Sequence, residues 1–290
     1  MRYTTSGGEF IPGRVRWWQW PTILALDAPA VALTWQAMLA RVVGVVLLRH
    51  HVVLLGISVW LAYAADRWIE GWRLSTETVR TQRHYFYLRW RWSTFVGWIV
   101  VLVAGVTVTL IRFTLREWMA SLTLLVPTLL YLLSHQLLHR EHSWRVPKEV
   151  CIAALIACGA ALYPATLTNG RLHLLLAPTA LFMLLCLANC LLISVWESEV
   201  DRTHCQTSLA LQLAHTRVVA RGMPYGLVAL GFGMAMFSSG ATRTAAWCGA
   251  ASAALLATLN LVQPRIGRER ARVLADITLL TPLIAMLLQL

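Results

Sequence analysis

Residues 172–201 read LHLLLAPTALFMLLCLANCLLISVWESEVD, and this stretch decides the fold class. The part from 172 to 196 contains no Asp, Glu, Lys or Arg, whereas three carboxylates follow within 197–201. About 20 consecutive apolar residues are enough for a helix to cross the hydrocarbon core of a membrane. We therefore expect a transmembrane helix here that ends in an acidic turn.

The rest of the chain has a similar composition. Hydrophobic residues make up 58% of the 290 residues and charged residues 13%, and the mean hydropathy is +0.62. A soluble domain ordinarily carries about 25% charged residues. The composition excludes a soluble enzyme and predicts an all-α, polytopic membrane protein. Nine segments are long enough to span: 22–48, 52–69, 93–111, 118–138, 149–164, 172–196, 223–240, 244–262 and 273–290.

The basic residues give an orientation. The net charge is +12, and Lys148 is the only lysine among 25 basic residues. With nine spans and a cytoplasmic N-terminus, 19 of the 25 lie on the cytoplasmic side and five lie outside. Such an excess is what the positive-inside rule describes. The charge is therefore explained by topology, and no nucleic-acid partner is expected.

We expect one domain over residues 1–290. Its first part, residues 1–21, contains a tryptophan cluster at 17–20 beside two arginines. Tryptophan and arginine are enriched where a membrane meets water. This segment is therefore predicted to lie at the membrane interface.

Two carboxylate pairs stand at the cytoplasmic ends of predicted spans. Asp66 and Glu70 follow the second span, and Glu197 and Asp201 follow the sixth. Residues four apart share one face of a helix, so each pair projects in one direction. Ionisable groups at membrane depth are expensive and suggest function. The alternative is a set of interfacial charges paired with nearby arginines.

A divalent cation would offset the repulsion within each pair. Mg²⁺ prefers oxygen ligands and is commonly held by one or two carboxylates together with phosphate oxygens and water. Two facing pairs would form a clamp for a Mg²⁺-bridged diphosphate, with the four carboxylates as metal ligands. Arginines can bind further phosphate oxygens, and aromatic faces can stabilise a carbocation. The candidates for phosphate binding are Arg67, Arg73 and Arg202. The candidates for stabilising the carbocation are Tyr63 and Trp68.

This layout resembles the UbiA superfamily of intramembrane prenyltransferases. That family has nine helices around a central cavity, an Asn-x-x-x-Asp-x-x-x-Asp motif after the second helix and an Asp-x-x-x-Asp motif after the sixth. Asp66 and Glu70 match the last two positions of the first motif, and Glu197 and Asp201 match the second. Ala62 stands where the family has Asn.

The resemblance implies Mg²⁺-dependent transfer of a prenyl group from an isoprenyl diphosphate to a hydrophobic or aromatic acceptor, among membrane lipids. Asp66, Glu70, Glu197 and Asp201 would bind the metal. Asn189 would bind diphosphate or metal-bound water. Lys148, at the start of the fifth span on the same membrane face, would either pair with Glu149 or contact the diphosphate. The site would face the cytoplasm. Two alternatives remain: a terpene cyclase of the same superfamily, which needs no acceptor, and a catalytically degenerate lipid-binding or transport protein.

Overall fold

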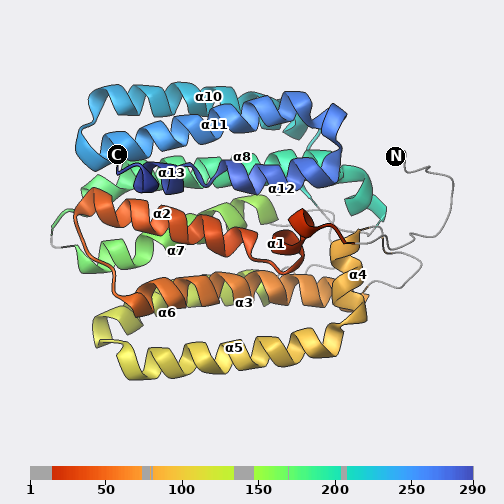
Figure 1. Cartoon of the computed structure of the whole chain (residues 1–290), viewed down its shortest axis with the longest axis horizontal. Coiled ribbons are helices and arrows are strands. Elements are labelled where there is room, and N and C mark those ends of the chain that lie inside the picture. Colours follow the sequence, from red (N-terminus) through yellow and green to blue (C-terminus); the bar gives the residue numbers. More distant parts are fainter. Residues whose placement is uncertain are drawn as a thin grey trace.

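The computed structural model describes residues 15–73, 79, 81–133, 147–168, 170–203 and 208–289. Every regular element within these ranges is a helix, and most helices run side by side in one bundle (Figure 1). The elements are η1 (Trp17–Gln19), α1 (Trp20–Ile23), α2 (Asp27–Val43), α3 (Arg49–Arg73), α4 (Gln82–Arg89), α5 (Arg91–Arg112), α6 (Leu115–Leu133), α7 (Lys148–Leu167), α8 (His173–Thr203), α9 (Leu209–Gln212), α10 (Thr216–Phe237), α11 (Gly240–Ile266), α12 (Arg268–Thr278) and α13 (Thr281–Leu287).

Six of these helices, α3, α5, α7, α8, α10 and α11, are long and apolar enough to cross a membrane. A bent pair, η1–α1 with α2, would make a seventh span. The chain is therefore an all-α, multi-pass integral membrane protein over the residues described. The predicted count of nine spans is not confirmed, although α6 and the α12–α13 pair occupy the other two predicted segments.

Two predicted segments are not continuous helices. The first segment bends by 76° between α1 and α2, and Ala25 adopts a φ of +57° at that bend. A left-handed residue cannot continue a right-handed helix. The last segment breaks at Leu279 and Leu280, where α12 ends, and Pro282 lies in the first turn of α13. Neither predicted segment is therefore one continuous helix.

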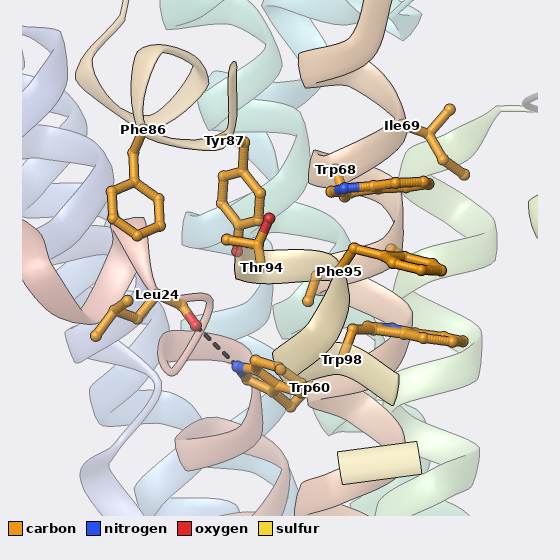
Figure 2. A pocket seen from close by; sticks show the side chains of 12 residues that line it. Leu24, Trp60, Trp68, Ile69, Phe86, Tyr87, Thr94, Phe95 and Trp98 are labelled. Atoms are coloured by element: carbon orange, nitrogen blue, oxygen red, sulfur yellow. Dashed lines mark hydrogen bonds between the residues drawn. The ribbon is translucent and has the colours of Figure 1, made fainter. Parts of the chain in front are cut away.

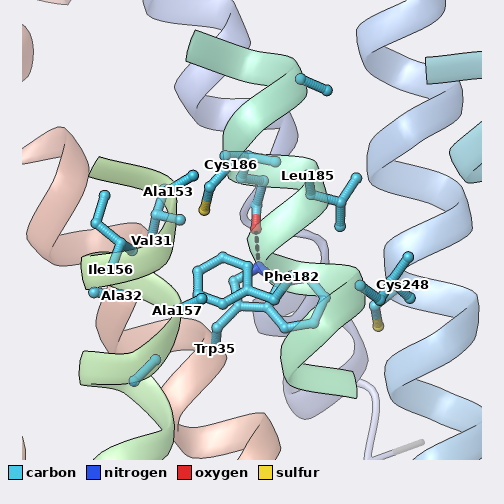
Figure 3. Packing of buried hydrophobic residues seen from close by; sticks show 14 of the residues in the cluster. Val31, Ala32, Trp35, Ala153, Ile156, Ala157, Phe182, Leu185, Cys186 and Cys248 are labelled. Atoms are coloured by element: carbon cyan, nitrogen blue, oxygen red, sulfur yellow. Dashed lines mark hydrogen bonds between the residues drawn. The ribbon is translucent and has the colours of Figure 1, made fainter. Parts of the chain in front are cut away.

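The centre of the bundle is packed around Trp35 on α2. This side chain is 0% exposed and stacks on Phe182 of α8, with 4.5 Å between the ring centroids (Figure 3). The Trp35 indole N–H donates to the carbonyl of Leu279 at 2.9 Å. A buried indole N–H needs a partner, and the break after α12 supplies one.

α3 and α8 end on the same side of the bundle, where the short helix α4 crosses the end of α3 (Figure 1). Gly71 permits that crossing, because a Cβ atom there would lie 3.0 Å from Cβ of Tyr87 on α4. The sequence places the two carboxylate pairs at these helix ends. The end of α3, the helix α4 and the end of α8 therefore lie at the end of the bundle where the site was predicted.

Candidate active site

The two acidic pairs share the same cations. Lys148, the first residue of α7, interacts electrostatically with Asp201, Glu70 and Asp66. Charge–charge interactions in a protein weaken with distance and solvent exposure. One ammonium group is therefore near enough to residues of both acidic pairs to interact with them electrostatically.

A second cation joins the pairs from the side of α4. Arg83 interacts electrostatically with both Glu197 and Glu70. Burial, followed by repulsion from Arg272 and Arg67, lowers the pKa of Arg83 to about 10. Neutral pH still leaves this guanidinium charged. The polar region between α3, α4 and α8 therefore contains several cations as well as carboxylates.

Glu197 also has an ion-pair partner on α12. Nη1 of Arg272 donates to Oε2 of Glu197, and both side chains are largely buried. A cavity of about 50 Å³ borders this pair and Arg83. Two guanidinium groups, of Arg83 and Arg272, and two carboxylates, of Glu197 and Glu269, line this cavity, so it is strongly polar and its formal charges balance.

Glu70 is held by a histidine from α4. Nε2 of His84 lies 3.2 Å from Oε2 of Glu70, and Nδ1 of His84 lies 2.7 Å from Oγ1 of Thr81. His84 is only 1% exposed. The ring is thus fixed from both sides and orients the Glu70 carboxylate.

Asn189 and Arg67 belong to a neighbouring group that we call the inner polar cluster: Asp27, Arg67, Asn189 and Asp276. Nδ2 of Asn189 donates to Oδ1 of Asp276 at 2.8 Å, and its Oδ1 has no hydrogen-bond partner within the described residues. Nη2 of Arg67 lies 3.6 Å from Oδ2 of Asp27, and Nη1 donates to the carbonyl of Thr22. Both predicted diphosphate-binding residues therefore have protein partners here.

Trp68 lies on a different face of α3 from the carboxylates. Successive helix residues are 100° apart, so Trp68 is turned by about 160° from Asp66. Its ring lines an apolar cavity of about 290 Å³ between α3, α4 and α5 and stacks on Phe95 (Figure 2). Its indole N–H donates to the carbonyl of Arg91. Trp68 therefore faces this apolar cavity and not the side of α3 that carries Asp66 and Glu70, and its role at a carbocation stays a prediction.

The remaining predicted residues are distributed as follows. Tyr63 is half-buried, and the Arg67 guanidinium lies 5.8 Å from its ring centroid. Arg202 is exposed near the end of α8. Arg73 is the last residue of α3, and its side chain lies outside the described part of the chain. Of the substrate-binding candidates, only Lys148 is tied to both acidic pairs by the interactions described above.

Three residues at this site were missed by sequence reasoning: Arg83, His84 and Arg272. They come from α4 and α12: His84 lies 14 residues after its partner Glu70, and Arg272 lies 75 residues after its partner Glu197. The basic and aromatic residues at 81–92 marked α4 in the sequence. Their spacing does not indicate which carboxylates the side chains of α4 contact.

Comparison with known proteins identifies the architecture. A scan against protein-family models and a search of curated proteins both found no match. Among solved structures, a UbiA homolog from Aeropyrum pernix K1 matches with a TM-score of 0.56 and 14% sequence identity, over 91% of this chain and 98% of that one. This chain has the UbiA fold. The resemblance drawn from the acidic motifs is thus confirmed at the level of the fold, across nearly the whole length.

Proposed function

We propose that this protein is a Mg²⁺-dependent intramembrane prenyltransferase of the UbiA superfamily, acting on an isoprenyl diphosphate at the cytoplasmic side. The observation that carries the proposal is the sharing of Lys148 and Arg83 by acidic pairs from two helices. Paired carboxylates surrounded by buried cations suit a ligand that brings both a divalent metal and phosphate oxygens. The UbiA fold supports the reaction class.

The donor set fits the metal. Asp66, Glu70, Glu197 and Asp201 offer hard carboxylate oxygens from α3 and α8, which is the ligand type that Mg²⁺ prefers. Mg²⁺, when bound, would neutralise charge on the diphosphate and make it a better leaving group. We propose these four residues as its ligands.

The chain's own cations would hold the diphosphate. Arg83 and Arg272 can each bind phosphate oxygens in bidentate fashion, and Lys148 adds a third positive charge. Glu197 would then exchange part of its pairing with Arg272 for the ligand. These groups position the diphosphate before its bond to the prenyl carbon breaks and stabilise the charge that develops on it.

The apolar bundle would accommodate the prenyl chain and keep water away from the allylic cation. Tyr63 lies on the same helix as Asp66 and offers an aromatic face that can stabilise a cation. A hydrophobic or aromatic acceptor would attack the cation and then lose a proton. A terpene cyclase would instead form a cyclic product from the diphosphate alone, so product analysis distinguishes the two.

One observation favours the non-enzymatic alternative. Glu70 and Glu197 already have protein partners, His84 and Arg272, and Ala62 replaces the family's Asn. A degenerate lipid-binding or transport protein would retain such pairs in place of a metal. It would release no pyrophosphate from any prenyl diphosphate.

The test is pyrophosphate release by purified protein with Mg²⁺ and prenyl diphosphates of increasing chain length. We expect release by the wild type and its loss in Asp66→Ala and Asp201→Ala, because each removes a proposed ligand. Glu199→Ala is the matched control, since Glu199 lies on α8 with an exposed side chain. Undiminished release in both Asp66→Ala and Asp201→Ala would contradict the proposal.

A further inference from the structure

A second group of ligand-type side chains lies at the opposite end of the bundle from α4. His50 and His51 occupy the start of α3, and Glu117 occupies the first turn of α6. The loops that lead into these two helices lie at the same end of the molecule (Figure 1). The cluster is therefore separated from the proposed diphosphate site by the length of α3.

The three side chains converge on one carboxylate oxygen. Nε2 of His51 lies 2.6 Å from Oε1 of Glu117, and Nε2 of His50 lies 3.9 Å from the same oxygen. One ligand atom from each residue falls within 4.8 Å of the other two. The His51 side chain is 0% exposed, Glu117 7% and His50 16%.

Helix capping explains only part of this arrangement. Oε2 of Glu117 accepts hydrogen bonds from the backbone N–H of Thr114 at 2.7 Å and from its hydroxyl at 2.8 Å, which forms a capping box at the start of α6. Oε1 is left to face the two imidazoles. Nε2 of His50 is buried and has no hydrogen-bond partner among the described residues. A buried polar atom without a partner calls for an explanation.

We propose that His50, His51 and Glu117 form a binding site for a divalent transition metal of the Zn²⁺ type. Bonds of about 2.0–2.2 Å in tetrahedral geometry place two ligand atoms about 3.4 Å apart. The two distances to Oε1, 2.6 Å and 3.9 Å, fall on either side of this spacing. Small side-chain shifts in opposite directions would bring both imidazoles to bonding distance.

The surroundings of His51 set the cost of binding. Its ring stacks on Tyr163 with 4.6 Å between centroids, and its Nδ1 accepts the Leu48 N–H at 3.3 Å. Nε2 of His51 can bind a metal only after its proton moves to Nδ1. A protonated Nδ1 no longer accepts the Leu48 N–H, so that hydrogen bond is lost. Stacking keeps the ring in place meanwhile. No proton is released overall.

Two imidazoles and one carboxylate match the ligand set of zinc sites with an open fourth position. Water would complete the coordination. The bound metal would join the start of α3 to the start of α6 and so stabilise the bundle against unfolding. Mg²⁺, which prefers oxygen ligands, would not compete for this site.

The experiment uses full-length protein, purified in detergent without a polyhistidine tag and stripped of metal with a chelator. Co²⁺ is added as the spectroscopic probe, and then Zn²⁺ as the competitor. We expect one equivalent of Co²⁺ to give visible absorption bands of tetrahedral coordination that Zn²⁺ abolishes. Zn²⁺ should also raise the melting temperature in a concentration-dependent manner.

Variants separate this site from adventitious binding. His50→Ala and Glu117→Gln should lose the Co²⁺ bands, and Glu117→Gln retains an oxygen that can still cap α6. His173→Ala should keep them, because His173 is an exposed histidine at the start of α8. Absence of the bands in wild type, or their persistence in either cluster variant, would overturn the proposal. The result does not depend on the diphosphate site.

Discussion

The largely buried carboxylates Glu197 and Glu70 each have a basic partner. Glu197 pairs with Arg272 and Glu70 with His84, while Lys148 acts on both acidic pairs. Removing one partner from a buried pair leaves an uncompensated charge, which is more costly than the pair itself. These partners therefore hold the carboxylates in fixed positions.

His84 offers a test of this positioning role. Substituting His84→Ala removes the group that orients Glu70, and the loss of such a supporting partner typically lowers metal affinity or activity about 10- to 100-fold. We expect pyrophosphate release to need a higher Mg²⁺ concentration for half-maximal rate. His84→Gln, which can still donate a hydrogen bond, should restore part of the affinity.

The control for this series is His215→Ala, which removes an exposed histidine just before α10. A drop in rate with an unchanged Mg²⁺ requirement in His84→Ala would argue that the substitution only disturbs folding. The positioning role predicts that His84→Ala needs more Mg²⁺ for half-maximal rate and that His215→Ala does not.

Individual site residues were predictable only where local spacing encodes them. Asp66 with Glu70 and Glu197 with Asp201 are visible as residues four apart at the ends of apolar runs. The partners His84 and Arg272 are not visible in this way, because contacts between separate helices leave no fixed interval in the sequence. Helix geometry separates Trp68 from the carboxylates, because its position is about 160° around α3 from Asp66.

Close approach between helices depends on small residues. Gly231 of α10 faces α11, and a Cβ atom there would lie 2.9 Å from the backbone nitrogen of Ala250. Membrane helices commonly pack through such small residues. The hydrophobic effect does not drive helices together within a bilayer, so close van der Waals contact has to do so. The α10–α11 contact therefore has no room for one more carbon at this position.

We predict that Gly231→Ala lowers the free energy of unfolding by about 1–3 kcal/mol, the usual cost of overpacking a close contact. Gly233→Ala is the matched control on the same helix, since nothing lies within 4 Å of its Cβ position. The control should be neutral or slightly stabilising. Thermal unfolding of both variants in detergent gives the comparison, and equal melting temperatures would contradict the packing described.

Helices were predictable where one apolar run is bounded by arginines. The segment predicted at 93–111 corresponds to α5 at Arg91–Arg112, and 52–69 corresponds to α3 at Arg49–Arg73. The bend at Ala25 left no comparable signal, because a positive φ is uncommon for residues other than glycine and alanine does not mark one in the sequence. Pro282 was a signal for the break before α13, because proline favours the first turn of a helix.

The molecule as a whole separates its polar groups by membrane side. The acidic pairs, their cations and α4 lie at one end of the bundle, and the cluster of two histidines and Glu117 lies at the other. Between them the outward-facing surface is apolar, as on α5, where Val96, Val100 and Val103 are exposed. A bilayer therefore covers the middle, and the two proposed sites lie toward opposite ends.

Ligand-induced stabilisation tests most directly whether both acidic pairs serve one diphosphate. A ligand at 100 times its Kd stabilises a folded protein by about 2.7 kcal/mol. With Mg²⁺ and a prenyl diphosphate that wild type turns over, we predict a rise in melting temperature that Asp66→Asn and Asp201→Asn each abolish. Full stabilisation in either variant would show that one pair is dispensable and would contradict a shared site.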